Sequence, residues 1–182
     1  MKKSEYLYLD HAATTPMREV AIKAFIDAEH EGFANSSGGH NLSRKAKNIL
    51  EESRETISSI FEVAPNEIIF TSGGTEADNW SIKSLFNKET ESNANLVTSS
   101  IEHEAVLASA EWIKDNDFTV TFAECLETGE LDKNNFLNAI NKNTIVASAM
   151  WANNETGIIQ PIKELTKEVK KINSDTLFHS DF

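Results

Sequence analysis

The alternation of helical and strand periods is the feature that most constrains the fold of this chain. Short apolar runs, of which Asn95–Ser99 is the clearest, alternate with longer amphipathic stretches such as 161–172. Apolar side chains that recur every three to four residues predict helices, and short apolar runs bounded by turn residues predict buried strands. Because alternating strands and helices are typical of α/β proteins, the sequence predicts a mostly parallel sheet flanked by helices.

Turn and cap residues place the individual elements. A first helix is predicted after Thr15-Pro16, because threonine is a good N-cap and proline fits the first helical position. The next helix places its apolar side chains, from Leu42 to Phe61, on one stripe. Strands are predicted at 67–71, 95–99, 118–123, 144–151 and 176–179, with further helices after Thr75 and after Glu104 and at 132–140 and 161–172.

Charge and hydropathy exclude several classes of function. Asp plus Glu number 29 against 17 Lys plus Arg, which gives a formal net charge of −12. Such an acidic surface repels the phosphates of nucleic acids, so nucleic-acid binding is not expected. Since the sequence has neither an apolar run long enough to span a bilayer nor a signal-peptide pattern, we expect a cytoplasmic protein without membrane association.

Cysteine and histidine usage argues against disulfides and metal. Cys125 is the single cysteine, which excludes an internal disulfide framework and a cysteine-rich metal site. The histidines at positions 11, 30, 40 and 179 show no metal-ligand spacing among themselves. We therefore predict no metal site.

Polar side chains follow several predicted strands at the point where each strand ends. Thr75, His103, Asn154 and Asp181 all occupy such positions. Ligands of open α/β sheets bind outside the carboxyl ends of the strands. These four residues are therefore candidates for one shared site.

The loop that contains Gly74 and Thr75 has the composition of a phosphate cup. Glycines allow the backbone to approach an anion, and the helix that follows offers free N–H groups and the positive end of its dipole. The sequence matches neither a Walker loop nor a dinucleotide-binding fingerprint. A tight strand-to-helix turn is the alternative, and the loop alone does not decide between the two.

Each of the other three candidates could have a role in binding or catalysis, or could have only a structural or surface role. Asp181 could pair with a protonated ring nitrogen, as pyridoxal phosphate requires, or it could be a surface aspartate. His103 could stack on a cofactor ring and shuttle a proton, or it could be an exposed histidine at a helix start. An asparagine amide at Asn153 or Asn154 could hydrogen-bond a phenolic oxygen, or the pair could belong to a turn formed by Asn and Gly.

Taken together, the motifs resemble the cysteine desulfurases of the class V aminotransferase superfamily. The resemblance is carried, in the family's order and along the whole chain, by the segments 8–16 (YLDHAATTP), 71–79 (TSGGTEADN), 100–106 (SIEHEAV), 153–157 (NNETG) and 179–181 (HSD). It implies the large domain of fold type I of the pyridoxal-phosphate-dependent transferases, with pyridoxal 5′-phosphate as cofactor. It also implies that residues 1–15 associate with the small domain and that 16–182 form a large domain that is incomplete at its C-terminal end.

The resemblance assigns roles to particular residues. Gly74 and Thr75 would bind the phosphate, and Asn154 would contact the phenolic oxygen. Asp181 would pair with the ring nitrogen. His103 would stack on the ring and assist proton transfer, which makes it the catalytic residue of this segment.

The implied activity is that of a sulfurtransferase. L-cysteine would be converted to L-alanine while an enzyme persulfide keeps the sulfur and passes it to an acceptor such as an iron–sulfur scaffold protein. A homodimer is implied as well. The alternatives are another enzyme of the superfamily, such as a selenocysteine lyase or an aminotransferase, and a non-catalytic truncated fragment.

The chain departs from the family pattern at two kinds of position. The substrate loop of the family appears here as 35–43 (NSSGGHNLS), with its proline, one serine and its final glycine replaced. The family's cofactor-binding lysine and sulfur-accepting cysteine have no match in residues 1–182, and Cys125 stands in the wrong place, as a bystander thiol. We therefore expect this chain alone to be inactive.

Overall fold

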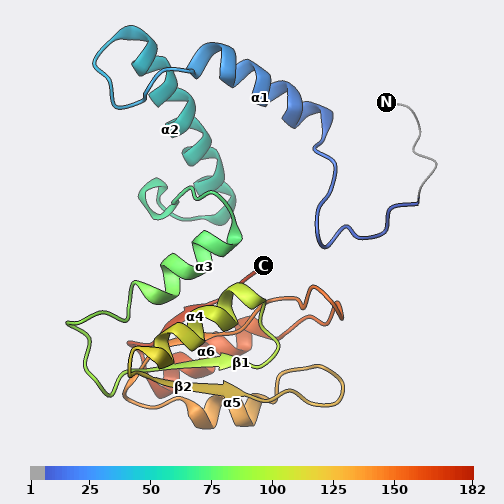
Figure 1. The fold of residues 1–182 in the computed structure, drawn as a ribbon, viewed down its shortest axis with the longest axis vertical. Helices are drawn as coiled ribbons and strands as arrows, with labels where there is room; N and C mark the ends of the chain where they lie inside the picture. Colours follow the sequence, from blue (N-terminus) through green and yellow to red (C-terminus); the bar gives the residue numbers. More distant parts are fainter. Residues whose placement is uncertain (1–6) are drawn as a thin grey trace. The chain divides into compact units, whose positions relative to one another are not determined.

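The computed structural model describes residues 7–182, which divide between Phe70 and Thr71 into two compact units (Figure 1). Residues 1–6, part of the segment predicted to associate with a small domain, lie outside the described residues. In chain order the elements are α1 (Glu19–Gly32), α2 (Asn41–Phe61), the short 3₁₀ helix η1 (Pro65–Glu67), α3 (Gly74–Lys83), β1 (Asn95–Ser99), α4 (Glu104–Asp115), β2 (Thr119–Ala123), α5 (Lys133–Ala139), β3 (Thr144–Ser148), α6 (Ile162–Ile172) and β4 (Leu177–His179).

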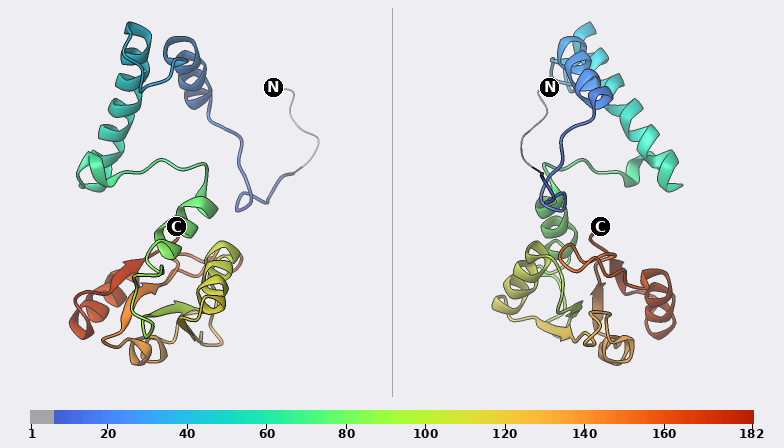
Figure 2. Two further views of the ribbon diagram at one scale, coloured as in Figure 1. Left: turned by 60° about the vertical axis from the view of Figure 1, so that its left-hand side comes forward. Right: turned by 90° about the vertical axis from the view of Figure 1, so that its right-hand side faces the viewer.

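The second unit is a three-layer α/β structure. Its four strands are all parallel and lie in the order β2-β1-β3-β4. Helix α4 covers one face of this sheet, and α5 and α6 cover the other (Figure 2). The prediction of an α/β fold with a parallel sheet flanked by helices is confirmed.

Two apolar cores, one on each face, hold these layers together. Leu96 and Val97 are neighbours on β1 and point to opposite faces, because successive strand residues alternate. The Leu96 side packs against α3 and α4 through Ile82 and Val106, and the Val97 side packs against α5 and α6. All five residues of β1 are buried, as expected for a central parallel strand.

The first unit contains a pair of packed helices. Helix α2 begins after His40, whose ring nitrogen Nδ1 accepts a hydrogen bond from the Ser43 amide at 3.3 Å. It ends at Glu62, which adopts a left-handed conformation with φ of 57°. Gly32 is the last residue of α1 and lies against the Ile49 side chain of α2. A Cβ added at Gly32 would lie 2.9 Å from the Ile49 Cδ1 atom.

Two sequence predictions are wrong. Helix α1 begins at Glu19 rather than after Thr15, because Arg18 is extended, with ψ of 144°, and its carbonyl accepts the first helical bonds. A Thr-Pro pair also suits an extended segment, since proline restricts the preceding residue. Residues 68–71 are no strand in the described part of the chain. Ile69 is 62% exposed there and has no strand to pair with.

The remaining predicted elements are present, the strand at 95–99 with its predicted bounds and the others with shifted ends. The third strand is shorter than predicted and ends at Ser148, opposite His179 at the end of β4, although backbone hydrogen bonds continue as far as Asp181. The predicted cap of α5 is confirmed, since the Asp132 carboxylate accepts from the amides of Asn134 and Asn135, both at 3.0 Å. Among the described residues, no helix has the length and apolar character that crossing a membrane requires.

Candidate functional site

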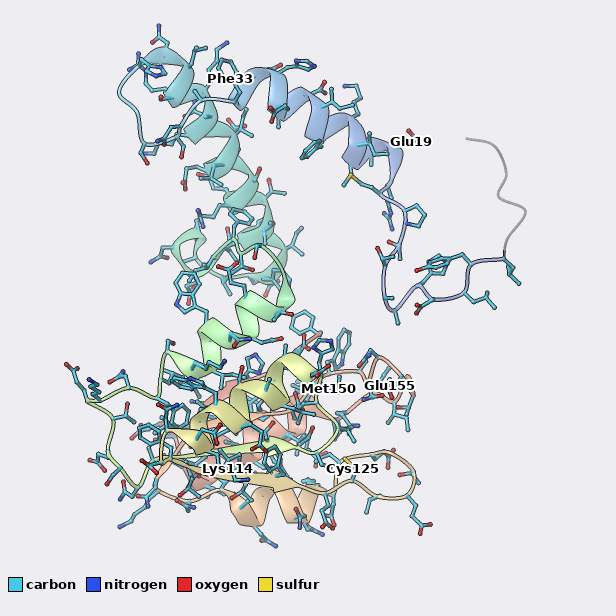
Figure 3. The ribbon with its side chains drawn as sticks, in the orientation of Figure 1. Glu19, Phe33, Lys114, Cys125, Met150 and Glu155 are labelled. Carbon is cyan, nitrogen blue, oxygen red and sulfur yellow. The ribbon has the colours of Figure 1, made fainter. Side chains whose placement is uncertain are left out.

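The carboxyl ends of β1, β3 and β4 meet at one edge of the second unit. Figure 3 shows this edge through Cys125, Met150 and Glu155, with Lys114 at the opposite end. His103 follows β1 and Asp181 follows β4. One nitrogen of the His103 ring and one carboxylate oxygen each of Asp181 and Asp78 lie within 4.8 Å of one another. The sequence prediction that His103 and Asp181 share a site is therefore consistent with the structure.

Backbone pairing beyond β4 places Asp181. The Ala149 amide donates to the carbonyl of His179 at 3.1 Å, and the Trp151 amide donates to the carbonyl of Asp181 at 2.9 Å. The parallel register of β3 and β4 thus continues past both strands. It leaves the half-buried Asp181 side chain facing the other polar groups of the cluster.

His103 is the N-cap of α4. Its Nδ1 accepts a hydrogen bond from the Ala105 amide at 3.2 Å, so the neutral ring carries its proton on Nε2. The residue is exposed, which leaves its ring accessible to a planar ligand. The cap therefore fixes both the tautomer and the position of the imidazole.

Gly74 and Thr75 form the first turn of α3. The first helical bond joins the Ala77 amide to the carbonyl of Gly73, so the earlier amides point out of the helix. No described side chain caps this helix, and a Cβ added at Gly73 or Gly74 would meet nothing within 4 Å. The arrangement is an open helix N-terminus, a kind of site that suits an anion.

Glu76 shapes the same loop. Its carboxylate accepts from the Ser72 amide and from the Ser72 hydroxyl, both at 2.6 Å. These two bonds lower the pKa of Glu76, the hydroxyl contributing most. The negative charge of the Glu76 carboxylate therefore lies on the Ser72 side of the loop. The amides of Gly74 and Thr75 form no hydrogen bond with it.

Asn153 and Asn154 have different tasks in the turn after β3. The Asn153 side chain donates to the carbonyl of Ile101 at 3.0 Å and accepts from the amides of Glu155 and Thr156. Asn154 is exposed and lines a cavity of about 440 Å³ together with His103. The turn reading therefore fits Asn153, and Asn154 is the residue available to a ligand.

The family model "Aminotransferase class-V" matches residues 7–182. The chain belongs to the class-V aminotransferase family.

Individual members of this family resemble the chain along nearly its full length. Cysteine desulfurase IscS of Methanosarcina thermophila is 36% identical over 179 residues, which cover 98% of this chain and 44% of the relative. A solved structure of a NifS-like protein matches with a TM-score of 0.93 at 31% identity, covering 97% of this chain and 48% of that one. A structure described as "SspA in complex with cysteine" matches with a TM-score of 0.90 at 33% identity over 96% of this chain and 50% of that one. The chain spans about half the length of the relatives it matches.

Asp78 and His179 are candidate site residues that the sequence analysis did not single out. His179 Nε2 lies 3.3 Å from an Asp78 carboxylate oxygen, and His179 Nδ1 lies 2.8 Å from the Ser148 hydroxyl. Burial, followed by the nearby Asp181 carboxylate, raises the pKa of Asp78, and burial lowers the pKa of His179. The one available signal was position, because Asp78 lies one helical turn after Gly74 and on the same side of α3.

Glu102 is, after Asp78, a second buried acid at this edge of the sheet. One of its oxygens accepts from the Ser99 hydroxyl and from the Met150 amide, the latter at 2.8 Å, and so links the ends of β1 and β3. The other oxygen is buried without a partner among the described residues. Burial raises the pKa of Glu102 to about 7.

Cys125 has the properties of a bystander. It is half-buried in a short bridge with Leu131, and burial raises the pKa of its thiol. The Ser100 hydroxyl approaches its sulfur at 3.9 Å. This hydrogen bond lowers the pKa of the thiol, but burial outweighs it, so the position disfavours the thiolate that a sulfur-accepting cysteine needs.

Proposed function

We propose that this chain binds pyridoxal 5′-phosphate and forms the cofactor-binding part of a cysteine desulfurase. The reaction would convert L-cysteine to L-alanine and keep the sulfur as an enzyme persulfide. The observation that carries this proposal is the meeting of His103 and two carboxylates within 4.8 Å beside an open helix N-terminus. The IscS name of the relatives and the cysteine bound by SspA support the desulfurase over the other class-V activities.

The two ends of the site suit the two charges of the cofactor. The amides of Gly74 and Thr75 and the α3 dipole suit a phosphate. The carboxylates of Asp181 and Asp78 suit a protonated ring nitrogen. Four residues at about 1.5 Å of rise separate Gly74 from Asp78 by about 6 Å along the helix, which is compatible with a six-membered ring on a short arm.

The chain's own residues would then act as follows. When bound, pyridoxal phosphate supplies an electron sink for the carbanion formed at the substrate. Asp181 holds a proton on the ring nitrogen, and the Asn154 amide donates to the phenolic oxygen. His103 stacks on the ring and delivers a proton from Nε2, the nitrogen that the Ala105 amide does not engage.

Further features of the whole protein rest on the family resemblance. We propose a homodimer, transfer of the persulfide sulfur to an acceptor such as an iron–sulfur scaffold, and a cytoplasmic location. Residues 1–15 would associate with a small domain, and residues 16–182 would belong to the large domain. We propose no resident metal, although the cluster of Asp78, His103 and Asp181 is close enough for an ion to contact all three.

Cofactor binding is tested by calorimetric titration of the chain with pyridoxal 5′-phosphate. We expect one site per chain and a loss of affinity in Asp181→Asn. The control is Asp175→Asn, which removes the same charge at an exposed position before β4. Equal affinity in all three proteins, or no binding at all, would contradict the proposal.

Activity is tested in a chimera. Residues 1–182 would replace the matching 44% of cysteine desulfurase IscS of Methanosarcina thermophila, and alanine release from L-cysteine would be measured. We expect alanine from the chimera and little from its His103→Ala variant. A chimera that folds and binds the cofactor but forms no alanine would refute the desulfurase function.

A further inference from the structure

The buried polar groups beside Asp181 form a connected chain. Ser148 lies on β3, His179 ends β4, and Asp78 lies on α3, so three separate elements contribute. Ser148 is fully buried, Asp78 is 5% exposed, and the His179 side chain is 15% exposed. Burying a carboxyl group is costly unless hydrogen bonds compensate it, so this arrangement needs a reason beyond packing.

The hydrogen-bond roles along this chain are fixed by chemistry. An ionised Asp78 only accepts, so His179 Nε2 carries the proton that it donates to Asp78 across 3.3 Å. The neutral ring then accepts at Nδ1, and the Ser148 hydroxyl donates to it across 2.8 Å. Both ring nitrogens of His179 thus have a partner without any net charge on the ring. The imidazole thus orients Asp78 and leaves its negative charge uncancelled.

The uncancelled charge adds to that of the other acids at this edge. The titratable groups facing Asp78 are His179 and Asp181 from the β4 end, His103 at the start of α4, and Glu102 at the end of β1. No described Lys or Arg forms an ion pair with Asp78 or with Asp181. Two carboxylates less than 5 Å apart favour a cation between them.

We propose that Asp78 is a second carboxylate for the cationic ring nitrogen of pyridoxal phosphate, and that His179 and Ser148 position it. This inference rests on the proposed function, because it concerns the same cofactor. Two carboxylates on one ring nitrogen would stabilise its proton more than Asp181 alone does. His179 and Ser148 touch no cofactor in this proposal and act through Asp78.

The test compares pyridoxal phosphate with its 1-deaza analogue, in which carbon replaces the ring nitrogen. Calorimetric titration of the wild-type chain should give tighter binding of pyridoxal phosphate than of the analogue. In Asp78→Asn this preference should fall on the order of tenfold, which corresponds to about one unit in the pKa of the ring nitrogen. Asp175→Asn is the matched control and should keep the full preference.

The positioning role has its own readout. His179→Gln keeps an N–H donor for Asp78 and should retain much of the preference, whereas His179→Phe should lose it. Because the Asp78 carboxylate opposes the lowering of the His179 pKa by burial, Asp78→Asn should lower that pKa further. Histidine-labelled NMR of the cofactor-free chain measures this shift, and circular dichroism verifies the fold of each variant.

The outcomes separate the inference from the proposed function. A wild-type chain that binds neither ligand refutes the proposed function and this inference together. If pyridoxal phosphate binds and Asp78→Asn weakens both ligands equally, or changes neither, Asp78 is structural and the inference alone is wrong. An unchanged His179 pKa in a folded Asp78→Asn chain would also overturn it.

Discussion

Glu102 illustrates how burial of one side chain creates a pH dependence. Its pKa of about 7 in the folded chain lies above the ordinary value of 4.5. As the pH rises from about 4.5 to about 7, Glu102 loses its proton in the unfolded state but keeps it in the folded state, so the free energy of unfolding falls. The difference of 2.5 units (7 − 4.5) corresponds to about 3 kcal/mol as an upper estimate.

Glu102→Gln should remove this dependence. The amide keeps an acceptor for Ser99 and Met150 and carries no charge, so the variant should gain stability relative to wild type between pH 5 and pH 8. Urea denaturation at both pH values measures the difference, with the exposed neighbour Glu104→Gln as control. The same pH dependence in Glu102→Gln and in wild type would show that Glu102 does not carry the effect.

Cys125 yields a second prediction at the scale of one residue. Because burial raises the pKa of its thiol, little thiolate exists near neutral pH. Alkylation by iodoacetamide, followed by mass spectrometry, should be slower in the folded chain than in the same chain unfolded in urea. Faster alkylation of the folded chain would identify an activated thiol and reopen a role in sulfur chemistry.

At the scale of one helix, the start of α3 can be tested with a matched pair of substitutions. Gly74→Pro removes one free amide and fits the first helical position, because the preceding Gly73 is extended with ψ of 175°. Gly74→Ala keeps the amide, and its Cβ would enter open space. One lost hydrogen bond to a charged phosphate costs about 1.5–3 kcal/mol, so Gly74→Pro should lower affinity for pyridoxal phosphate at least tenfold.

Calorimetric titration measures both variants. Gly74→Ala should bind the cofactor nearly as well as wild type. If the alanine and proline variants weaken binding to the same extent, the cause is the added side chain rather than the amide, and the phosphate site is elsewhere.

At the scale of the whole molecule, exposed apolar side chains predict association. Val20 and Phe25 on α1 are 73% and 67% exposed, and Ile60 on α2 is 71% exposed. Strand β4 lies at the edge of the sheet, with Leu177 50% exposed. Apolar patches and unpaired strand edges favour contact with another chain.

We therefore expect the mass from light scattering to exceed 20.2 kDa and to fall on dilution. Phe25→Glu should reduce association, whereas the exposed polar substitution Lys45→Glu should change it less. A monodisperse monomer at every concentration that melts cooperatively would contradict this prediction.

Local patterns determined much of the fold in advance. Periodicity located the four strands of the sheet and most helices, because the side chains that an element buries must be apolar and must recur with the period of that element. Caps are equally local, and Asp132 was identified from its neighbours alone. The motif set also singled out Gly74, His103 and Asp181 as candidates, since glycine, imidazole and carboxylate have distinct chemistry at strand ends, and the structure brings His103 and Asp181 together.

Tertiary structure decided what depends on a distant partner. The apolar run at 68–71 forms no strand because a ladder needs a neighbour, which the described residues do not offer. Asp78 and His179 meet because β3 and β4 pair in parallel beside α3. No local pattern around either residue reveals this contact, because the two residues lie far apart in the sequence. The pKa of Glu102 depends on its burial between the ends of β1 and β3, which outweighs the hydrogen bonds from Ser99 and Met150. The type of each residue can be read from the sequence directly, whereas its burial and its contacts arise only when separate elements pack together.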